Sequence, residues 1–476
     1  MNDTGGSGEE VRLAKSSPGA IAGLSATIFL SSLGGSVANV GLPTLSRAFA
    51  ISFPQAQWIV IAYFLAVISL IVNAGRLADS VGRQRLILAG LALFGLASIG
   101  AGAASSFWFL IAARALQGVG GAIMLVLAFA LVCDIVRAER LGSALGLLAA
   151  MSGLGTAAGP SLGGLLIAVS GWRALFLVNV PVCIAIAWMI YRTVPRTLHP
   201  EATPWRFDWA GTALLISALC AYCYAATPAS GHFATGNAIA LTLAVAAAAA
   251  FILVERRVAD PLLRLGMFRD VVLCGNLAMS VIGSAVIMAT LVVGPFYLVE
   301  GLRMKPVQAG LVLSVGPVIS VIAGVPIGRL VDRLGIAAMS MSGLVIMGAG
   351  TMALALGEGI VGLPRFVGAV IAVMGGYGAF QIANNAAVMA KSSSGTRGNF
   401  AGMINLSRNI GLVTGASVMA SIFSATAHDR TSTGLAAAHG LRATFAVAAG
   451  MAAVAVAIGL SSGAIAFVRR NAKPGG

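Results

Sequence analysis

The sequence predicts an all-α protein that crosses a membrane about fourteen times. The chain of 476 residues is 58% hydrophobic and only 9% charged, and its mean hydropathy is +0.95. Soluble domains carry roughly 25% charged residues, so a soluble protein of this composition could not cover its own surface. The few charges are also spaced widely enough to leave uncharged intervals that can each hold a spanning helix of ~20 residues.

Uncharged intervals locate the predicted spans along the chain. Residues 174–191 hold one short span, and residues 209–254 are long enough for two, with T-P-A-S-G-H at 227–232 as the turn between them. Two more spans, near 107–133 and 399–424, are each interrupted by a single Arg. The other intervals are 16–46, 48–75, 86–113, 141–172, 271–299, 306–328, 334–357, 366–390 and 443–468.

The distribution of Lys and Arg predicts the orientation in the membrane. With the N-terminus inside, 21 of the 30 basic residues fall in cytoplasmic segments and 7 in outer segments. Short cytoplasmic loops are enriched in basic residues, so both termini are predicted to be cytoplasmic. The net charge of +15 is explained by these loops. A basic stripe with interleaved aromatic residues would indicate a nucleic-acid partner, and the sequence contains none.

The predicted spans contain little that indicates catalysis. Cys220 and Cys223 form C-A-Y-C within one span, but no His or acid close in sequence would complete a metal site, and two small apolar residues on one helix face explain the pair. No nucleophile–base pair or ligand cluster is visible in the spans. We therefore expect no enzymatic activity, metal or cofactor.

A short motif occurs once in each half of the chain. Residues 75–85 have the sequence G-R-L-A-D-S-V-G-R-Q-R, and residues 328–335 have G-R-L-V-D-R-L-G. Each follows a predicted span and enters a cytoplasmic loop, and the pattern resembles the loop motif of the major facilitator superfamily. Asp79 and Arg83 are four residues apart, so they could pair on a helix, although positive-inside topology alone would also explain the basic residues. The cytoplasmic gating motif then comprises Gly75, Asp79, Gly82, Arg83, Gly328, Asp332 and Arg333.

A second motif lies in the fifth predicted span, where residues 153–164 have the sequence G-L-G-T-A-A-G-P-S-L-G-G. Glycines recurring every four residues form a smooth stripe for close helix contact, and a proline permits a kink. The pattern resembles the antiporter motif of the superfamily, carried here by Gly155, Gly159, Pro160, Gly163 and Gly164. W-R at 172–173, F-L-V-N-V-P at 176–181 and N-L-S-R-N-I-G at 405–411 are similar to the fourteen-helix drug:proton antiporter branch, the multidrug efflux type.

This resemblance implies the major facilitator fold, with two six-helix bundles at 1–192 and 271–476 and two additional transmembrane helices in a linker at 193–270. It implies secondary active efflux of amphipathic organic solutes by alternating access, by a monomer in the bacterial cell membrane, with protons as the coupling ion. An exporter of a neutral or anionic metabolite, and a non-transporting membrane receptor on the same scaffold, are the alternatives.

Polar residues within the spans are the candidates for substrate binding and coupling. Arg114 lies inside the fourth span, where insertion costs ~2.5–3.5 kcal/mol, so it must face the bundle or a wet cavity. In the superfamily the matching Arg is tied to substrate or proton movement, and pairing with backbone carbonyls is the structural alternative. Gln117 lies on the same helix face. The remaining candidates, for which hydrogen bonding or packing between helices is the alternative, are Asn39, Tyr63, Gln381, Asn384, Asn385 and Arg408.

The first predicted span departs from the family pattern. It has the sequence L-G-G-S-V-A-N-V-G-L-P at 33–43, with Gly34 where the branch usually carries a membrane-embedded Asp. All fifteen acidic residues lie in loops, in tails or at the ends of spans, as Asp134 and Glu300 do. A buried carboxylate is what a proton or a cationic drug would bind, so we expect a cavity suited to neutral or anionic substrates, and proton coupling that uses Asp134 or Glu300 or is absent.

Overall fold

A computed structural model describes residues 18–71, 74, 77, 81–136, 138–194, 208–227, 235–258, 265–356, 361–391, 397–427 and 433–471. Thirteen helices within these residues are long and apolar enough to cross a membrane. The remaining predicted span, at 306–328, forms α13, a helix of 29 residues. Its first part, Pro306–Gly316, is apolar but shorter than a full span. The helical, membrane-spanning character predicted from composition is confirmed.

The N-terminal half consists of α2 (Pro18–Phe49), α3 (Phe53–Ile71), α5 (Arg83–Gly102), α6 (Phe107–Ile135), α7 (Ala138–Ser170), α8 (Ala174–Leu177) and α9 (Asn179–Thr193). Residues 174–191 were expected to form one span. The structure divides this segment near its start, at Val178, into α8 and α9. Pro181 lacks the N–H that would bond the carbonyl of Leu177, which accounts for the break. Within this half α2 packs along α7, and α6 packs against α3 and α5.

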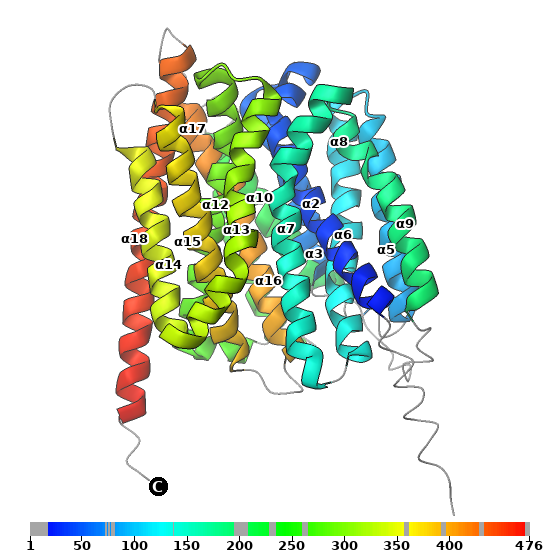
Figure 1. The fold of residues 1–476 in the computed structure, drawn as a ribbon, viewed down its shortest axis with the longest axis vertical. Helices are drawn as coiled ribbons and strands as arrows, with labels where there is room; N and C mark the ends of the chain where they lie inside the picture. The colour runs from blue at the N-terminus through cyan, green and yellow to red at the C-terminus, as the bar shows by residue number, and fades with distance from the viewer. Residues whose placement is uncertain are drawn as a thin grey trace, which may run out of the picture.

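The C-terminal half begins with a short 3₁₀ turn at Leu265–Arg269 and α12 (Val271–Phe296), which continues through a π-helical turn, η2 (Tyr297–Gly301). The next elements are α13 (Pro306–Leu334), α14 (Ile336–Ala355), α15 (Leu363–Met389), α16 (Arg397–Thr414), η3 (Gly415–Met419), α17 (Ala420–Ala427) and α18 (Thr433–Asn471). The start of α2 and the end of α18 lie at the same end of the bundle (Figure 1).

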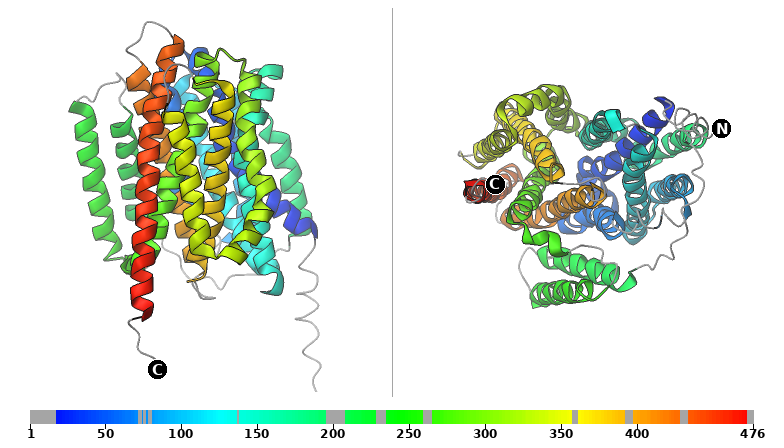
Figure 2. Two further views of the ribbon diagram at one scale, coloured as in Figure 1. Left: turned by 60° about the vertical axis from the view of Figure 1, so that its left-hand side comes forward. Right: turned by 90° about the horizontal axis from the view of Figure 1, so that it is seen from below.

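The two helices expected between the halves are α10 (Trp209–Ala226) and α11 (Thr235–Glu255). They pack on each other and stand at the periphery of the bundle, where α10 contacts α3 and η3 (Figure 2). Apolar side chains of α11 such as Leu243 and Val245 are more than half exposed. Such a surface is suited to lipid, and the predicted hairpin at 209–254 is confirmed, although most of its turn lies outside the described residues.

Glycines let α7 approach its neighbours closely. An added Cβ at Gly155 would lie 2.3 Å from the carbonyl oxygen of Phe29 in α2, and one at Gly163 would lie 2.9 Å from that of Val37. On the other side, an added Cβ at Gly164 would lie 3.1 Å from the Cα atom of Gly310 in α13. The helix that carries the predicted antiporter motif therefore packs backbone to backbone against both halves.

Candidate functional site

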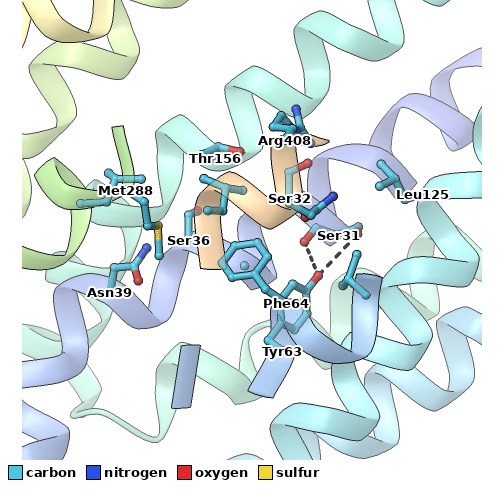
Figure 3. Close-up of a pocket in the computed structure, with 15 residues that line it drawn as sticks. Ser31, Ser32, Ser36, Asn39, Tyr63, Phe64, Leu125, Thr156, Met288 and Arg408 are labelled. Atoms are coloured by element: carbon cyan, nitrogen blue, oxygen red, sulfur yellow. Dashed lines mark hydrogen bonds between the residues drawn. The ribbon is translucent and has the colours of Figure 1, made fainter. Parts of the chain in front are cut away.

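A cavity of about 30 Å³ lies between the two halves (Figure 3). Helices α2, α3, α6 and α7 supply one side of it, and α12 and α16 supply the other. This volume is close to that of a single water molecule, whereas sites for drug-sized ligands measure roughly 300–1,000 Å³. In this structure the cavity is therefore too small for a drug-sized ligand. Its lining residues are Ser31, Ser32, Gly35, Ser36, Asn39, Tyr63, Phe64, Val67, Leu125, Thr156, Met288, Leu291, Arg408, Asn409 and Leu412.

Hydroxyl groups on α2 and α3 tie the cavity wall to the helix backbones. Tyr63 donates through its Oη atom to the carbonyl of Ser31 at 2.6 Å, and Ser31 donates to the carbonyl of Gly121 at 3.0 Å. Ser36 donates to the carbonyl of Gly155 at 3.2 Å. Because these donors are already used by backbone carbonyls, they shape the wall and leave other groups to bind a solute.

Asn39 is a polar group on this wall with unused hydrogen-bonding atoms in the described structure. Its side chain is only 1% exposed, and neither its Oδ1 nor its Nδ2 atom has a hydrogen-bond partner within the described residues. It borders the cavity (Figure 3). A buried amide without partners costs roughly 1–3 kcal/mol by protein mutational data, so a solute that supplies partners would recover that free energy.

Arg408 lies on the opposite side of the cavity, on α16. Its two terminal nitrogens lie 3.4 and 3.3 Å from the Oγ atom of Ser152 on α7, and Ser152 in turn bonds the hydroxyl of Ser32 at 2.8 Å. The Nε atom of Arg408 has no partner within the described part of the chain. These long contacts hold the guanidinium weakly, since N–H···O bonds are usually near 2.9 Å, and they connect the two halves.

Arg114 is fully buried on α6 and is separated from the cavity by Tyr63. Its Nε atom donates to the carbonyl of Ile59 at 2.8 Å and its Nη1 atom to that of Gly34 at 3.0 Å. It also donates to Gln117, whose amide donates to Ser98 at 2.7 Å. The guanidinium carbon lies 4.6 Å from the centre of the Tyr63 ring. The structure thus shows the carbonyl pairing that was the structural alternative for Arg114.

The polar cluster predicted on α15 does not border the cavity. Gln381 donates to Asn385 at 3.1 Å, and Asn384 donates to the carbonyl of Asn276 on α12 at 3.2 Å. The Oε1 atom of Gln381 and the Oδ1 atom of Asn384 have no partner among the described residues. The bond to Asn276 links α12 to α15, as expected for hydrogen bonding between helices.

At the end of the bundle that carries the termini, Arg83 pairs with Asp134 at the end of α6, with nitrogen–oxygen distances of 2.6 and 2.7 Å. Gly82, just before α5, has a φ of +97°, a conformation that favours glycine. Gly75 and Asp79 lie outside the described residues, so the predicted pairing of Asp79 with Arg83 is untested. In the second copy, Gly328 and the exposed Arg333 lie on α13, as does Asp332, whose side chain is not described.

The C-terminal half has its own ion pair at the same end, between Lys391 after α15 and Asp270 before α12. Partial burial acts to raise the pKa of Asp270, but the hydrogen bond from Lys391 and those from the backbone N–H groups of Leu273 and Val272 outweigh it and lower the pKa below its ordinary value. Within the described residues, each half thus has a carboxylate–cation pair at the end of the bundle that carries the termini.

Several residues of the cavity were not singled out from the sequence. Ser32 and Ser36 are four residues apart on α2, and Asn39 follows three residues later, so all three share one helix face. That periodicity is a signal the sequence contains. Thr156 and Asn409 had no comparable signal, because their helices meet α2 only in the folded protein.

Charge in the site is of one sign. Among the described residues that line the cavity, Arg408 alone is charged. The acidic side chains that the structure describes lie at helix ends, namely Asp134, Asp208, Glu255, Asp270 and Glu300. No group of three potential metal ligands occurs in the described ranges. The site can therefore offer a solute hydrogen bonds, an apolar wall and one positive charge.

Comparison with known proteins agrees with this architecture. Residues 24–416 match the model of the Major Facilitator Superfamily. The chain is 32% identical over 334 residues to the multidrug resistance protein Stp of Mycobacterium tuberculosis, an alignment that covers 70% of this chain and 61% of Stp. It is 28% identical to the multidrug efflux pump LfrA of Mycolicibacterium smegmatis, covering 85% of this chain and 81% of LfrA.

Among solved structures, a bacterial homologue of the human lysosomal transporter Spinster, in an inward-facing and unoccupied conformation, superposes with a TM-score of 0.67. The superposition covers 94% of this chain and 97% of that one, at 15% sequence identity. This similarity concerns the fold.

Proposed function

The chain belongs to the Major Facilitator Superfamily, and we propose that it exports amphipathic organic solutes across a bacterial cell membrane by alternating access. The observation that carries the proposal is the cavity between the halves, which joins an apolar wall to hydroxyl and amide groups. Two relatives named for multidrug resistance and efflux support the direction of transport.

Alternating access requires two bundles that move against each other around a central site. In the proposal these bundles are residues 1–192 and 271–476, with α10 and α11 in the linker 193–270 and with the chain acting as a monomer. The contacts of Arg408 with Ser152 cross from one bundle to the other. Widening of the cavity would break these weak contacts first.

The proposed orientation places both termini in the cytoplasm, as the distribution of basic residues predicts. An aromatic cluster then closes the outer end of the cavity: the ring of Phe53 lies 4.1 Å from that of Phe296 and 5.5 Å from that of Phe423. Arg47 and Glu300 also interact electrostatically at this end. The structure would represent a state closed to the outside.

Expression in a bacterial strain that lacks its own efflux pumps tests the proposal. Cells carrying the protein should tolerate higher concentrations of amphipathic compounds in a susceptibility panel and should retain less of them. Thr156→Trp would fill the cavity and should abolish both effects, whereas Val169→Trp on the same helix, at a side chain that is 76% exposed, should not.

Equal membrane abundance of the two variants is required for this comparison. Unchanged efflux by Thr156→Trp would show that transport does not use this cavity. Binding of compounds without flux in proteoliposomes would support a receptor in place of a transporter.

A further inference from the structure

The charges around the central cavity differ from those needed to bind a cation or a proton. Arg408 is the charged residue on the described lining, and the Arg114 guanidinium lies behind the Tyr63 ring that faces the cavity. Of the acidic side chains that the structure describes, Asp134 and Asp270 are paired with Arg83 and Lys391 at the end of the bundle. The cavity is thus bordered by positive charge, which attracts anions.

The two sides of the cavity together provide anchors suited to an anionic head group. The Nε atom of Arg408 and the Nδ2 atom of Asn39 are donors without partners in the described structure. Guanidinium binds carboxylate and sulfonate-like oxygens with charge-assisted hydrogen bonds. In this structure the terminal nitrogens of Arg408 contact the neutral hydroxyl of Ser152 at 3.3–3.4 Å, which is long for a hydrogen bond. An anion would therefore displace Ser152 readily and free the contact between α16 and α7.

Apolar residues complete the site on its other faces. Phe64 and Val67 on α3 and Met288 and Leu291 on α12 border the same cavity. The hydrocarbon or aromatic body of a solute can be buried against them, and burial of apolar surface contributes roughly 25 cal/mol per Å². The recognised molecule is therefore an anion with an apolar body.

Export of such a molecule does not need a proton carrier. Among the described residues that line the cavity there is no Asp, Glu or His side chain, the groups that relay protons in transporters. A bacterial interior is electrically negative, so an anion that leaves it moves down the electrical gradient. Resting on the export function proposed above, we propose that this protein exports amphipathic organic monoanions, driven by the membrane potential and without proton exchange.

Flux into proteoliposomes that contain the purified full-length protein tests this. The probe is radiolabelled taurocholate, an amphipathic sulfonate that stays ionised, compared with neutral chloramphenicol and cationic ethidium. A potassium gradient with valinomycin sets the potential, and a separate buffer gradient sets the pH difference. Taurocholate should accumulate about tenfold for each ~59 mV of inside-positive potential, and a pH gradient without a potential should leave it at the level of empty liposomes.

Three variants report on the groups involved. Arg408→Gln should reduce taurocholate flux at least about tenfold, as expected for loss of a charge-assisted bond, while Arg408→Lys should retain part of it. Asn39→Asp places a carboxylate in the cavity and should suppress taurocholate flux while increasing ethidium flux. Thermal unfolding of each purified variant shows whether a loss of flux is merely a loss of folding, and the gain of ethidium flux cannot come from misfolding.

The outcomes separate the two proposals. Taurocholate flux that follows the pH gradient and ignores the potential would overturn the proposed driving force. Flux of ethidium or chloramphenicol without flux of taurocholate would overturn the substrate class and leave the export function standing. Absence of flux for all three probes would contradict export as well.

Discussion

Gly34 connects the buried arginine to the first helix. Its carbonyl accepts a hydrogen bond from Arg114 at 3.0 Å, and an added Cβ would lie 2.6 Å from the Cζ atom of Phe94. The space that an Asp side chain would need is occupied by this ring. No carboxylate contacts the Arg114 guanidinium within the described residues. It is stabilised instead by the carbonyls of Ile59 and Gly34 and by the face of the Tyr63 ring.

Replacing Gly34 tests how tightly this position is filled. Gly34→Ala should lower the free energy of unfolding by about 1–3 kcal/mol, because forcing atoms into a packed core strains it, and Gly34→Asp should lower it further in the wild-type background. Adding Phe94→Leu should recover most of the loss in both. The measurement is the thermal unfolding midpoint of the purified protein in detergent.

In that widened background, Gly34→Asp should pair with Arg114 and make transport sensitive to pH, while Gly34→Ala should not. Full stability of Gly34→Asp without any change at Phe94 would contradict the packing seen here.

Helix α7 joins the two halves at the element scale. Gly155, Gly159 and Gly163 let it lie against α2, and Gly164 brings it against Gly310 of α13. In lipid no hydrophobic force drives helices together, so close packing of small residues has to hold them. A helix that contacts both halves without side-chain interlocking is also one that can slide during alternating access.

Two glycines of α7 provide a matched comparison. At Gly155 an added methyl would meet the Phe29 carbonyl at 2.3 Å, whereas at Gly153 nothing lies within 4 Å. Gly155→Ala should therefore destabilise the protein by about 1–3 kcal/mol and reduce transport, and Gly153→Ala should leave both near wild type. Thermal unfolding and efflux rates of the two variants check this. Equal behaviour would mean that α7 and α2 are not in backbone contact.

At the scale of the whole molecule, an aromatic cluster joins the two halves at the end opposite the termini. The aromatic cluster of Phe53, Phe296 and Phe423 joins α3 to α12 and α17 there. A transporter that alternates must break such contacts to open. Weakening them should move the population toward a state open at that end.

Labelling of a cysteine placed in the cavity measures this shift. In a background without the five native Cys residues, Asn39→Cys should react slowly with an impermeant maleimide added outside cells, because position 39 is buried. Adding Phe53→Ala should increase the labelling rate several-fold, whereas Phe109→Ala, at a ring that is 51% exposed, should not change it. Faster labelling from the cytoplasmic side alone would reverse the assignment of the closed end.

The sequence alone determined the class, the spans and the family of this protein. Scarce charges mark where helices leave the membrane, because a charge inside lipid is costly, and this rule located even the hairpin of α10 and α11. The same rule singled out Asn39, Tyr63 and Arg408, because a polar group inside a span is costly unless it binds a partner or a solute.

Only the tertiary structure decided which of these polar residues share a site. Gln381, Asn384 and Asn385 are as polar as Asn39 but lie away from the described lining. Arg114 lies behind Tyr63, and its Nε and Nη1 atoms donate to backbone carbonyls. Ser152 and Arg408 are 256 residues apart and meet only where α7 and α16 cross between the halves. Helical periodicity fixes the face of a residue on its own helix, but packing between helices selects which faces meet.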